Sequence, residues 1–355
     1  MAQTSYGVNA AEAVKLWRKK LAREALKATW IGKFIGESDD SAIQIFDETG
    51  KSPGDRVTVI LRMQLTGDGV LGDGTLEGNE ESLATYTDNL LVNQLRHAVR
   101  SAGKMSEQRI PFKHRDEAMM GLKDWWAGRL DVTFFNHVCG NLNQTDTRYT
   151  GGNVTLGQTS GFGIWAGGGT NDEGLSSANT FTIDLLDSAV AIAKTSTPVL
   201  RPIMVDGNAM YLAFLHPWQV KSMRTSTTTG QWLDIQKAAT QGDGSKNNPI
   251  FTGALGVYNN VILHEAVRCT HGYNHTSLAA ITTTRRAVLL GAQACAIGFG
   301  QDYSFDKFDW NEELFDYGNQ LGVEAGAIFG LKKLQFNSAD FSSIIISTYS
   351  NASDS

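Results

Sequence analysis

The sequence predicts an α+β fold, and three observations indicate this class. Residues 111–140 place apolar side chains at the spacing of one helix face, and residues 57–66 alternate between apolar and polar side chains. The predicted strands and helices are mixed along the chain without regular βαβ repetition. A chain of 355 residues has room for two ordinary domains or for one large discontinuous domain.

The stretch 111–140 is the longest predicted element. Pro111 suits a first helical position, Gly140 can end the helix, and 1.5 Å per residue gives a length of about 40 Å. The pairs Trp125-Trp126 and Phe134-Phe135 are interpreted as core packing rather than as a platform for a ligand. The predicted apolar face consists of Met119, Leu122, Trp126, Leu130, Phe134 and Val138.

A two-stranded arm is predicted ahead of this helix. Residues 57–66 form a half-buried strand, residues 67–81 form a tip rich in glycine and acidic residues, and residues 82–99 can return as the partner strand. Such a hairpin is marginal alone in water, so its apolar face needs a cover from its own subunit or from a neighbour. The spacing of the acidic tip residues does not match a calcium-binding loop, which favours a solvated loop: Asp68, Asp73, Glu77, Glu80 and Glu81.

Two further segments allow several interpretations. Residues 10–30 form a basic amphipathic helix that either lies on a neighbouring subunit, packs on its own core or binds a membrane surface. Glu12, Glu24 and many alanines weaken the membrane interpretation. Residues 141–180 form a long polar segment, and loops of this length in compact domains are usually functional or mobile.

The remaining predicted elements are short. A helix is expected over 181–194, another from Pro217 and a third over 231–240. An apolar strand or helix is expected over 285–300. Further strands are predicted at 43–45, 198–205, 210–216, 257–263 and 340–350.

Composition excludes several functional classes. A net charge of −6 gives no basic surface for a dedicated nucleic-acid binder, although a protein that encloses DNA without gripping it has the same balance. No apolar run reaches the length of a membrane span, and no secretory signal is predicted. Cys139, Cys269 and Cys295 are few and far apart, which fits a reducing cytoplasm without a disulfide framework.

No local motif predicts catalysis. Residues 264–268 begin like a zinc-protease helix, but Arg268 stands where the second histidine is needed. The glycine-rich stretch 161–169 lacks the ending of a phosphate-binding loop. Histidines exposed on a loop are therefore preferred to a metal site for the nearby cluster, and no catalytic, cofactor-binding or metal-binding residue is predicted. That cluster consists of His264, Cys269, His271 and His275.

Six blocks in consistent order carry a family resemblance: 24–36, 61–81, 95–109, 124–141, 145–149 and 285–294. Through them the chain resembles the major capsid proteins of tailed bacteriophages, in the N4-like podovirus branch. The resemblance implies the HK97-like phage capsid fold with an N-terminal arm, a β-hairpin called the E-loop, a long spine helix, and peripheral and axial domains. The implied boundaries are 1–46 for the arm, 47–104 for the E-loop, 105–194 for the peripheral domain with spine helix 111–140, 195–305 for the axial domain, and 306–355 for the peripheral return and C-terminal strand.

The resemblance also implies a function. Copies are expected to form hexamers and pentamers through the E-loop and N-arm, and to close an icosahedral shell around double-stranded DNA, which is enclosed without specific binding. Assembly is expected in the host bacterial cytoplasm, with portal, scaffolding and decoration proteins as further partners and with no enzyme activity, cofactor or membrane. The alternatives are an encapsulin-like nanocompartment shell and, less favoured, a metal-dependent enzyme at His264–His275.

Covalent crosslinking, which occurs in some members of the wider fold, is not carried over to this chain. The tip contains Asn79 but no lysine, whereas Lys51 and Lys104 lie near the base of the hairpin. A crosslink that starts from the tip is therefore not expected.

Overall fold

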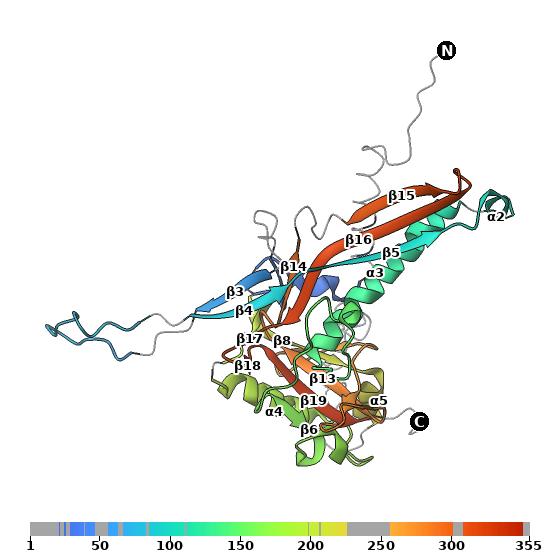
Figure 1. The fold of residues 1–355 in the computed structure, drawn as a ribbon. Coiled ribbons are helices and arrows are strands. Elements are labelled where there is room, and N and C mark those ends of the chain that lie inside the picture. Colours follow the sequence, from blue (N-terminus) through green and yellow to red (C-terminus); the bar gives the residue numbers. More distant parts are fainter. Residues whose placement is uncertain are drawn as a thin grey trace, which may run out of the picture.

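A computed structural model gives an elongated molecule with a hairpin that projects from one end (Figure 1). It describes residues 21, 25, 29–38, 40–46, 56–62, 67–82, 85–109, 111, 113–197, 199–205, 207–225, 256–300 and 308–350. Two large sheets and one long helix build the body, which confirms the α+β class. Among these residues no helix combines the length and the hydropathy needed to cross a membrane.

The first sheet is organised around β16 (Gln320–Lys333), a strand of 14 residues. It pairs with three strands: β14 (Cys295–Phe299), β15 (Asp309–Phe315) and β5 (Asn93–Arg100). Two short parallel strands, β1 (Ile35–Gly36) and β2 (Ile43–Phe46), extend the sheet beyond β14. Because β16 pairs along both of its edges, it joins all the other strands into one six-stranded sheet.

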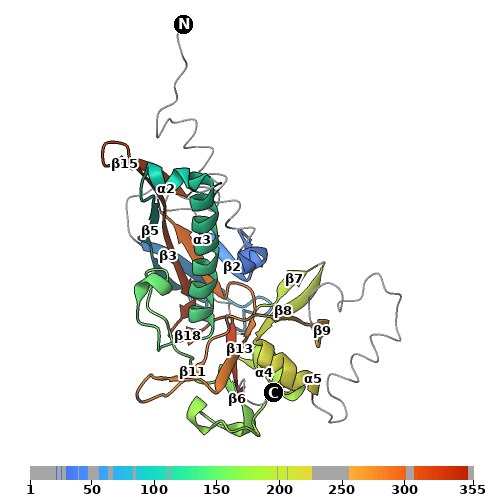
Figure 2. The same ribbon diagram turned by 90° about the vertical axis from the view of Figure 1, so that its right-hand side faces the viewer.

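The long helix α3 (His114–Val138) lies along one face of this sheet (Figures 1 and 2). All six residues of the predicted apolar face are buried, as are Phe135 and Cys139. Trp126 is fully buried against Phe308 and Phe329, so it packs in the core as predicted.

The two ends of α3 test the predicted boundaries. The helix begins at His114 rather than at Pro111, because Lys113 keeps an extended backbone and forms the N-cap. At the other end Gly140 has a φ of 59°, a left-handed conformation that glycine adopts at little cost. Its N–H donates to the His137 carbonyl, and the N–H of Asn141 donates to the Asn136 carbonyl, which together form a Schellman ending.

The second sheet has seven strands and its own core. Its order is β6 (Gly163–Trp165), β19 (Ser343–Tyr349), β13 (Thr284–Leu290), β8 (Asn208–Leu215), β10 (Val261–Glu265) and β9 (Gly256–Tyr258), with β7 (Ile203–Val205) paired to β8. The helices α4 (Ile183–Thr195) and α5 (Pro217–Thr225) contribute Leu186, Val190 and Met223 to this second core.

Smaller elements connect these layers. The E-loop hairpin consists of β3 (Arg56–Arg62) and β4 (Thr85–Leu91), which pair antiparallel with Val57 opposite Leu90. Single turns of 3-10 helix occur at η1 (Trp30–Phe34), η3 (Thr147–Tyr149), η4 (Ala166–Gly168) and η5 (Asp172–Gly174), and a short helix α2 (Lys104–Gln108) precedes α3. The remaining strands are β11 (Gly272–Tyr273) with β12 (Ala280–Ile281), and β17 (Gln335–Phe336) with β18 (Ala339–Asp340).

Several local predictions require correction. The single strand expected over 257–263 is two strands around Asn259-Asn260, whose φ values of 45° and 61° reverse the chain. The element expected over 285–300 is likewise two strands, β13 and β14, which join different sheets. The expected return strand over 82–99 divides after Leu91, because β4 pairs with β3 whereas β5 pairs with β16.

The two sheets draw strands from distant parts of the chain. The C-terminal strand β19 joins β13 in the seven-stranded sheet. Similarly, β14 joins the six-stranded sheet and α4 packs on the seven-stranded one. Strands that pair in these sheets are often far apart along the chain, as β2 and β14 are, so local patterns do not identify the sheet that a strand joins.

Some predictions fall mainly outside the described residues. The helix expected over 231–240 lies there entirely. Of the segment 10–30, only Leu21, Ala25, Thr29 and Trp30 are described. Leu21 and Ala25 are helical and buried in the core beside α3, so at these two positions the segment packs on its own subunit.

Candidate assembly interface

The base of the E-loop is packed on its own subunit. Val57, Val59 and Leu90 are buried, and they form one cluster with four residues of the body: Ala296, Leu334, Phe336 and Phe341. The alternation predicted for this strand is therefore correct over Val57–Ile60, where polar Thr58 and the apolar exception Ile60 are exposed. The cover that the apolar face requires is supplied here by the same chain.

Asn153 determines where the hairpin leaves the body. Its side-chain oxygen accepts from the N–H of Leu91 at 2.9 Å, and its amide nitrogen donates to the Leu91 carbonyl at 2.9 Å. Because Asn153 is buried and also bonds the Leu331 carbonyl, it ties the end of β4 to β16. The backbone of Leu91 thus keeps both hydrogen bonds at the junction between β4 and β5.

A second link holds β4 to the body. The carboxylate of Asp88 accepts from the ammonium of Lys332 and, at 3.0 Å, from the N–H of Gln335. Both Asp88 and Lys332 are largely shielded from water, so this pair is screened less than a surface pair. Together with Asn153 it makes the base a rigid support.

The tip of the E-loop, residues 67–81, is exposed throughout. Leu71 is 96% exposed and Leu76 is 61% exposed, and in Figure 1 this segment extends away from both sheets. Glu81 accepts from the N–H of Gly67 at 2.7 Å, so one carboxylate supports the loop itself. Exposed leucines on a projecting loop gain free energy when another surface covers them.

The base of the N-terminal arm is attached to α3. The carboxylate of Asp131 accepts from the backbone N–H groups of Trp30 and Ile31 at 3.3 and 3.2 Å. Burial raises the pKa of Asp131, while these two hydrogen bonds and the guanidinium of Arg268 oppose that shift. The arm therefore enters the body at a fixed point beside the helix.

The polar segment 141–180 is held by a buried ion pair. Asp172 and Arg286 are each 1% exposed, and the guanidinium of Arg286 donates to the Asp172 carboxylate. Arg286 also donates to the carbonyls of Cys139 and Gly140 at 3.1 and 3.0 Å, at the C-terminus of α3. This arginine consequently joins the end of the helix, the seven-stranded sheet and the polar segment.

The predicted cluster of ligand-type residues is dispersed. His264 packs among the rings of Phe34 and Phe214, and burial lowers its pKa. His264 and His271 are half-buried, so the prediction of exposed loop histidines is wrong for both and holds for His275. The thiol of Cys269 is buried and lies 3.7 Å from the Phe214 carbonyl. Within the described part of the chain, no three side chains of ligand type are grouped closely enough to hold a metal ion.

Known proteins give a consistent comparison. The model of the family described as "Phage capsid protein" matches residues 5–352. The chain belongs to this family. A curated major capsid protein of Pseudomonas phage KPP25 is 27% identical over 351 residues, which cover 91% of this chain and 89% of that protein.

Solved capsids confirm the fold. The capsid of Ralstonia phage GP4 is 31% identical, with a TM-score of 0.76 over 99% of this chain and 96% of that one. The capsid of cyanophage Pam1 is 18% identical, with a TM-score of 0.71 over 99% of this chain and 95% of that one. The HK97-like capsid fold is thereby established, and this phage capsid protein is a component of the virion. The N4-like branch remains a prediction.

Three structural features were not predicted from sequence: Asn153, the Asp88–Lys332 pair and the Asp172–Arg286 pair. The partners are 62, 244 and 114 residues apart along the chain, respectively. No spacing rule connects residues at such separations. The exposed tip, in contrast, was predicted because its glycine and acidic content is local.

Proposed function

We propose that copies of this capsid protein form hexamers and pentamers that close as an icosahedral shell around double-stranded DNA. The observation that carries the proposal is the E-loop, whose base is buried in its own subunit while its tip exposes two leucines. A neighbouring copy is the natural cover for that tip. Contacts of this heterologous kind form closed rings when the rotation between copies closes.

The two sheets provide the proposed domains. The six-stranded sheet with α3 is assigned to the peripheral domain, and the seven-stranded sheet with α4 and α5 is assigned to the axial domain around the symmetry axes. In this assignment the E-loop projects from the peripheral domain, and the N-terminal arm, attached at Asp131, contacts another copy.

The net charge supports a shell that encloses DNA rather than a protein that binds it tightly. The net charge of −6 opposes tight binding to phosphates, so packaged DNA is confined without specific contacts. We assign the chain a structural role without catalysis, and we place its assembly in the host bacterial cytoplasm. Portal, scaffolding and decoration proteins complete the proposed set of partners.

Replacing residues 67–81 by a short Gly-Ser linker tests the proposal. Because the buried base stays intact, the variant is expected to remain a folded, soluble subunit with an unchanged circular dichroism spectrum. Electron microscopy and sedimentation should find shells or capsomer rings for the unmodified chain and a loss of closed shells for the variant. Normal shells of equal stability from the variant would contradict the role of the E-loop.

A further inference from the structure

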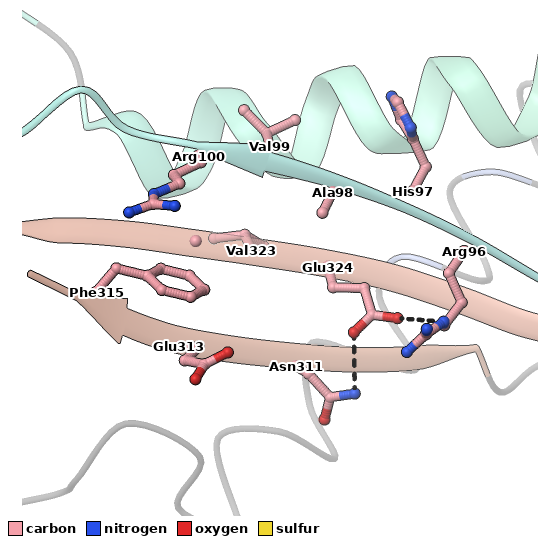
Figure 3. Close-up of a pocket in the computed structure, with 11 residues that line it drawn as sticks. Arg96, His97, Ala98, Val99, Arg100, Asn311, Glu313, Phe315, Val323 and Glu324 are labelled. Atoms are coloured by element: carbon pink, nitrogen blue, oxygen red, sulfur yellow. Dashed lines mark hydrogen bonds and ion pairs between the residues drawn. The ribbon is translucent and has the colours of Figure 1, made fainter.

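The six-stranded sheet has one covered face and one open face. On β5, His97 and Val99 point toward α3 (Figure 3). His97 stacks there on Trp125 with ring centroids 4.5 Å apart. Arg96, Ala98 and Arg100 alternate with them and are exposed. A cavity of about 380 Å³, here called the hollow, lies over β5, β15 and β16.

Phe315 and Arg100 determine the chemistry of the hollow. A Cβ atom on Gly322 would lie 2.7 Å from the Phe315 ring, so the absence of a side chain allows the ring to lie across β16. The guanidinium of Arg100 lies 4.2 Å above this ring and also donates to the side-chain oxygen of Gln320. Among the described residues, no carboxylate lies within ion-pair distance of Arg100.

The other charges of the hollow are arranged differently. Arg96 lies 3.5 Å from Glu324, so these two charges largely neutralise each other. Glu313 lies on β15 and disfavours a second carboxylate at that side. An apolar side chain beside Phe315 with a carboxylate near Arg100 is therefore the occupant that the hollow favours.

The tip of the E-loop presents this combination. Leu71 is followed two residues later by Asp73, and Leu76 is followed directly by Glu77. Both leucines are exposed, and the tip and the hollow lie at opposite ends of the molecule in Figure 1. A subunit therefore cannot place its tip in its own hollow.

We propose that the hollow is the docking site for the E-loop tip of a second copy of this chain. A tip leucine packs against Phe315 and Ala98, and the adjacent carboxylate pairs with Arg100. This inference rests on the proposed shell, since it names the surface that covers each tip within it. The contact is small and partly polar, so its strength in a shell comes from repetition over many copies.

Cysteine pairs test the docking site directly in assembled particles of the full chain. The variant Leu71→Cys with Ala98→Cys places one thiol on the tip and one in the hollow, both at exposed positions. The three natural cysteines are buried and do not compete. Under a mild oxidant, the double variant should give a ladder of covalent oligomers on a non-reducing gel, whereas either single variant should not give the ladder.

The matched control is Leu71→Cys with Val154→Cys, because Val154 is exposed but lies outside the hollow. An equal ladder from this control, or shells of the first variant that contain only monomers, would overturn the docking site and leave the proposed function standing. If the unmodified chain forms no shells under any condition, the proposed function itself fails.

Charge reversal gives an independent measurement. Arg100→Glu should raise the protein concentration needed for shell assembly by about two- to fivefold, the range for one partly exposed ion pair. Arg224→Glu makes the same charge change on α5, where the arginine is also exposed, and should leave this concentration unchanged. Equal effects of the two reversals would contradict a specific role for Arg100.

Discussion

The buried pair of Asp172 and Arg286 offers the sharpest test of how the fold is held. Replacing Asp172 by Ala leaves the guanidinium of Arg286 buried without its counter-charge. It also removes the acceptor for the Trp165 ring N–H at 3.2 Å and for the Tyr273 backbone N–H at 3.1 Å. Breaking one side of a buried pair typically costs about 3–5 kcal/mol.

Two further variants separate the pair from its surroundings. Arg286→Met keeps the donors from Trp165 and Tyr273 on Asp172, so we expect a smaller loss of about 3 kcal/mol. The double variant leaves no isolated charge, and its loss should fall below the sum of the single losses by about 2 kcal/mol or more. Because a domain has only about 5–15 kcal/mol of stability, these effects are large.

Urea unfolding of the unassembled subunit, followed by tryptophan fluorescence, measures these losses. The control is Arg148→Met, which removes an arginine from an exposed pair with Asp146 and should barely change the unfolding midpoint, because water screens that pair. If Asp172→Ala does not fold, a double variant that does fold still shows that removing Arg286 relieves the isolated buried charge. A loss for Arg286→Met no greater than that for Arg148→Met, or strictly additive losses, would refute the reasoning.

Two other predictions concern pH and backbone packing. Burial lowers the pKa of His137 to about 4, and burial likewise lowers that of His216 to about 4. Stability is therefore complete above about pH 6.5 and decreases by up to about 1.4 kcal/mol per pH unit for each histidine as the pH falls toward 4. Urea unfolding measures the free energy of unfolding at pH 7 and at pH 4.5. The loss of this free energy between the two pH values should be smaller for His137→Gln than for the unmodified chain. Gly330→Ala should destabilise by about 1–3 kcal/mol, because its Cβ would overlap the Leu91 carbonyl; Gly121→Ala, a helical position with open space, should stabilise by about 1 kcal/mol. A destabilised Gly121→Ala or a neutral Gly330→Ala in thermal melts would contradict this packing.

Local periodicity was sufficient to predict the parts of the fold that are repetitive. The helix α3 buries apolar side chains at helical spacing from Met119 to Val138, so its period of 3.6 can be followed in the sequence, although over Thr133–Val138 every residue is buried. The pairing of β3 with β4 follows because the two strands are adjacent along the chain. Six residue blocks then identified the capsid fold, which no single pattern could have done.

The predictions that failed, or were not made, concern contacts between residues that are far apart along the chain. Strand β19 is buried on both faces over Ser343–Thr348, so it has no alternation that would assign it to a layer. The turn at Asn259-Asn260 did leave a signal, since asparagine tolerates positive φ better than other residues with side chains. The amide of Asn153, in contrast, was one polar group among many in the segment 141–180, and only its long-range contact with Leu91 gives it a role.

The contrast between the base and the tip of the E-loop has a consequence for assembly. Val57, Val59 and Leu90 are buried within one subunit, so the hairpin keeps its direction before any partner binds, and little orientational freedom is lost on docking. In the proposed docking the tip contributes only a small contact, so a single misplaced copy can dissociate again. Once a ring closes, many such contacts must break together, and the shell becomes stable without any one strong interface. A stiff base and a weak tip are therefore the combination that allows errors to be corrected before closure.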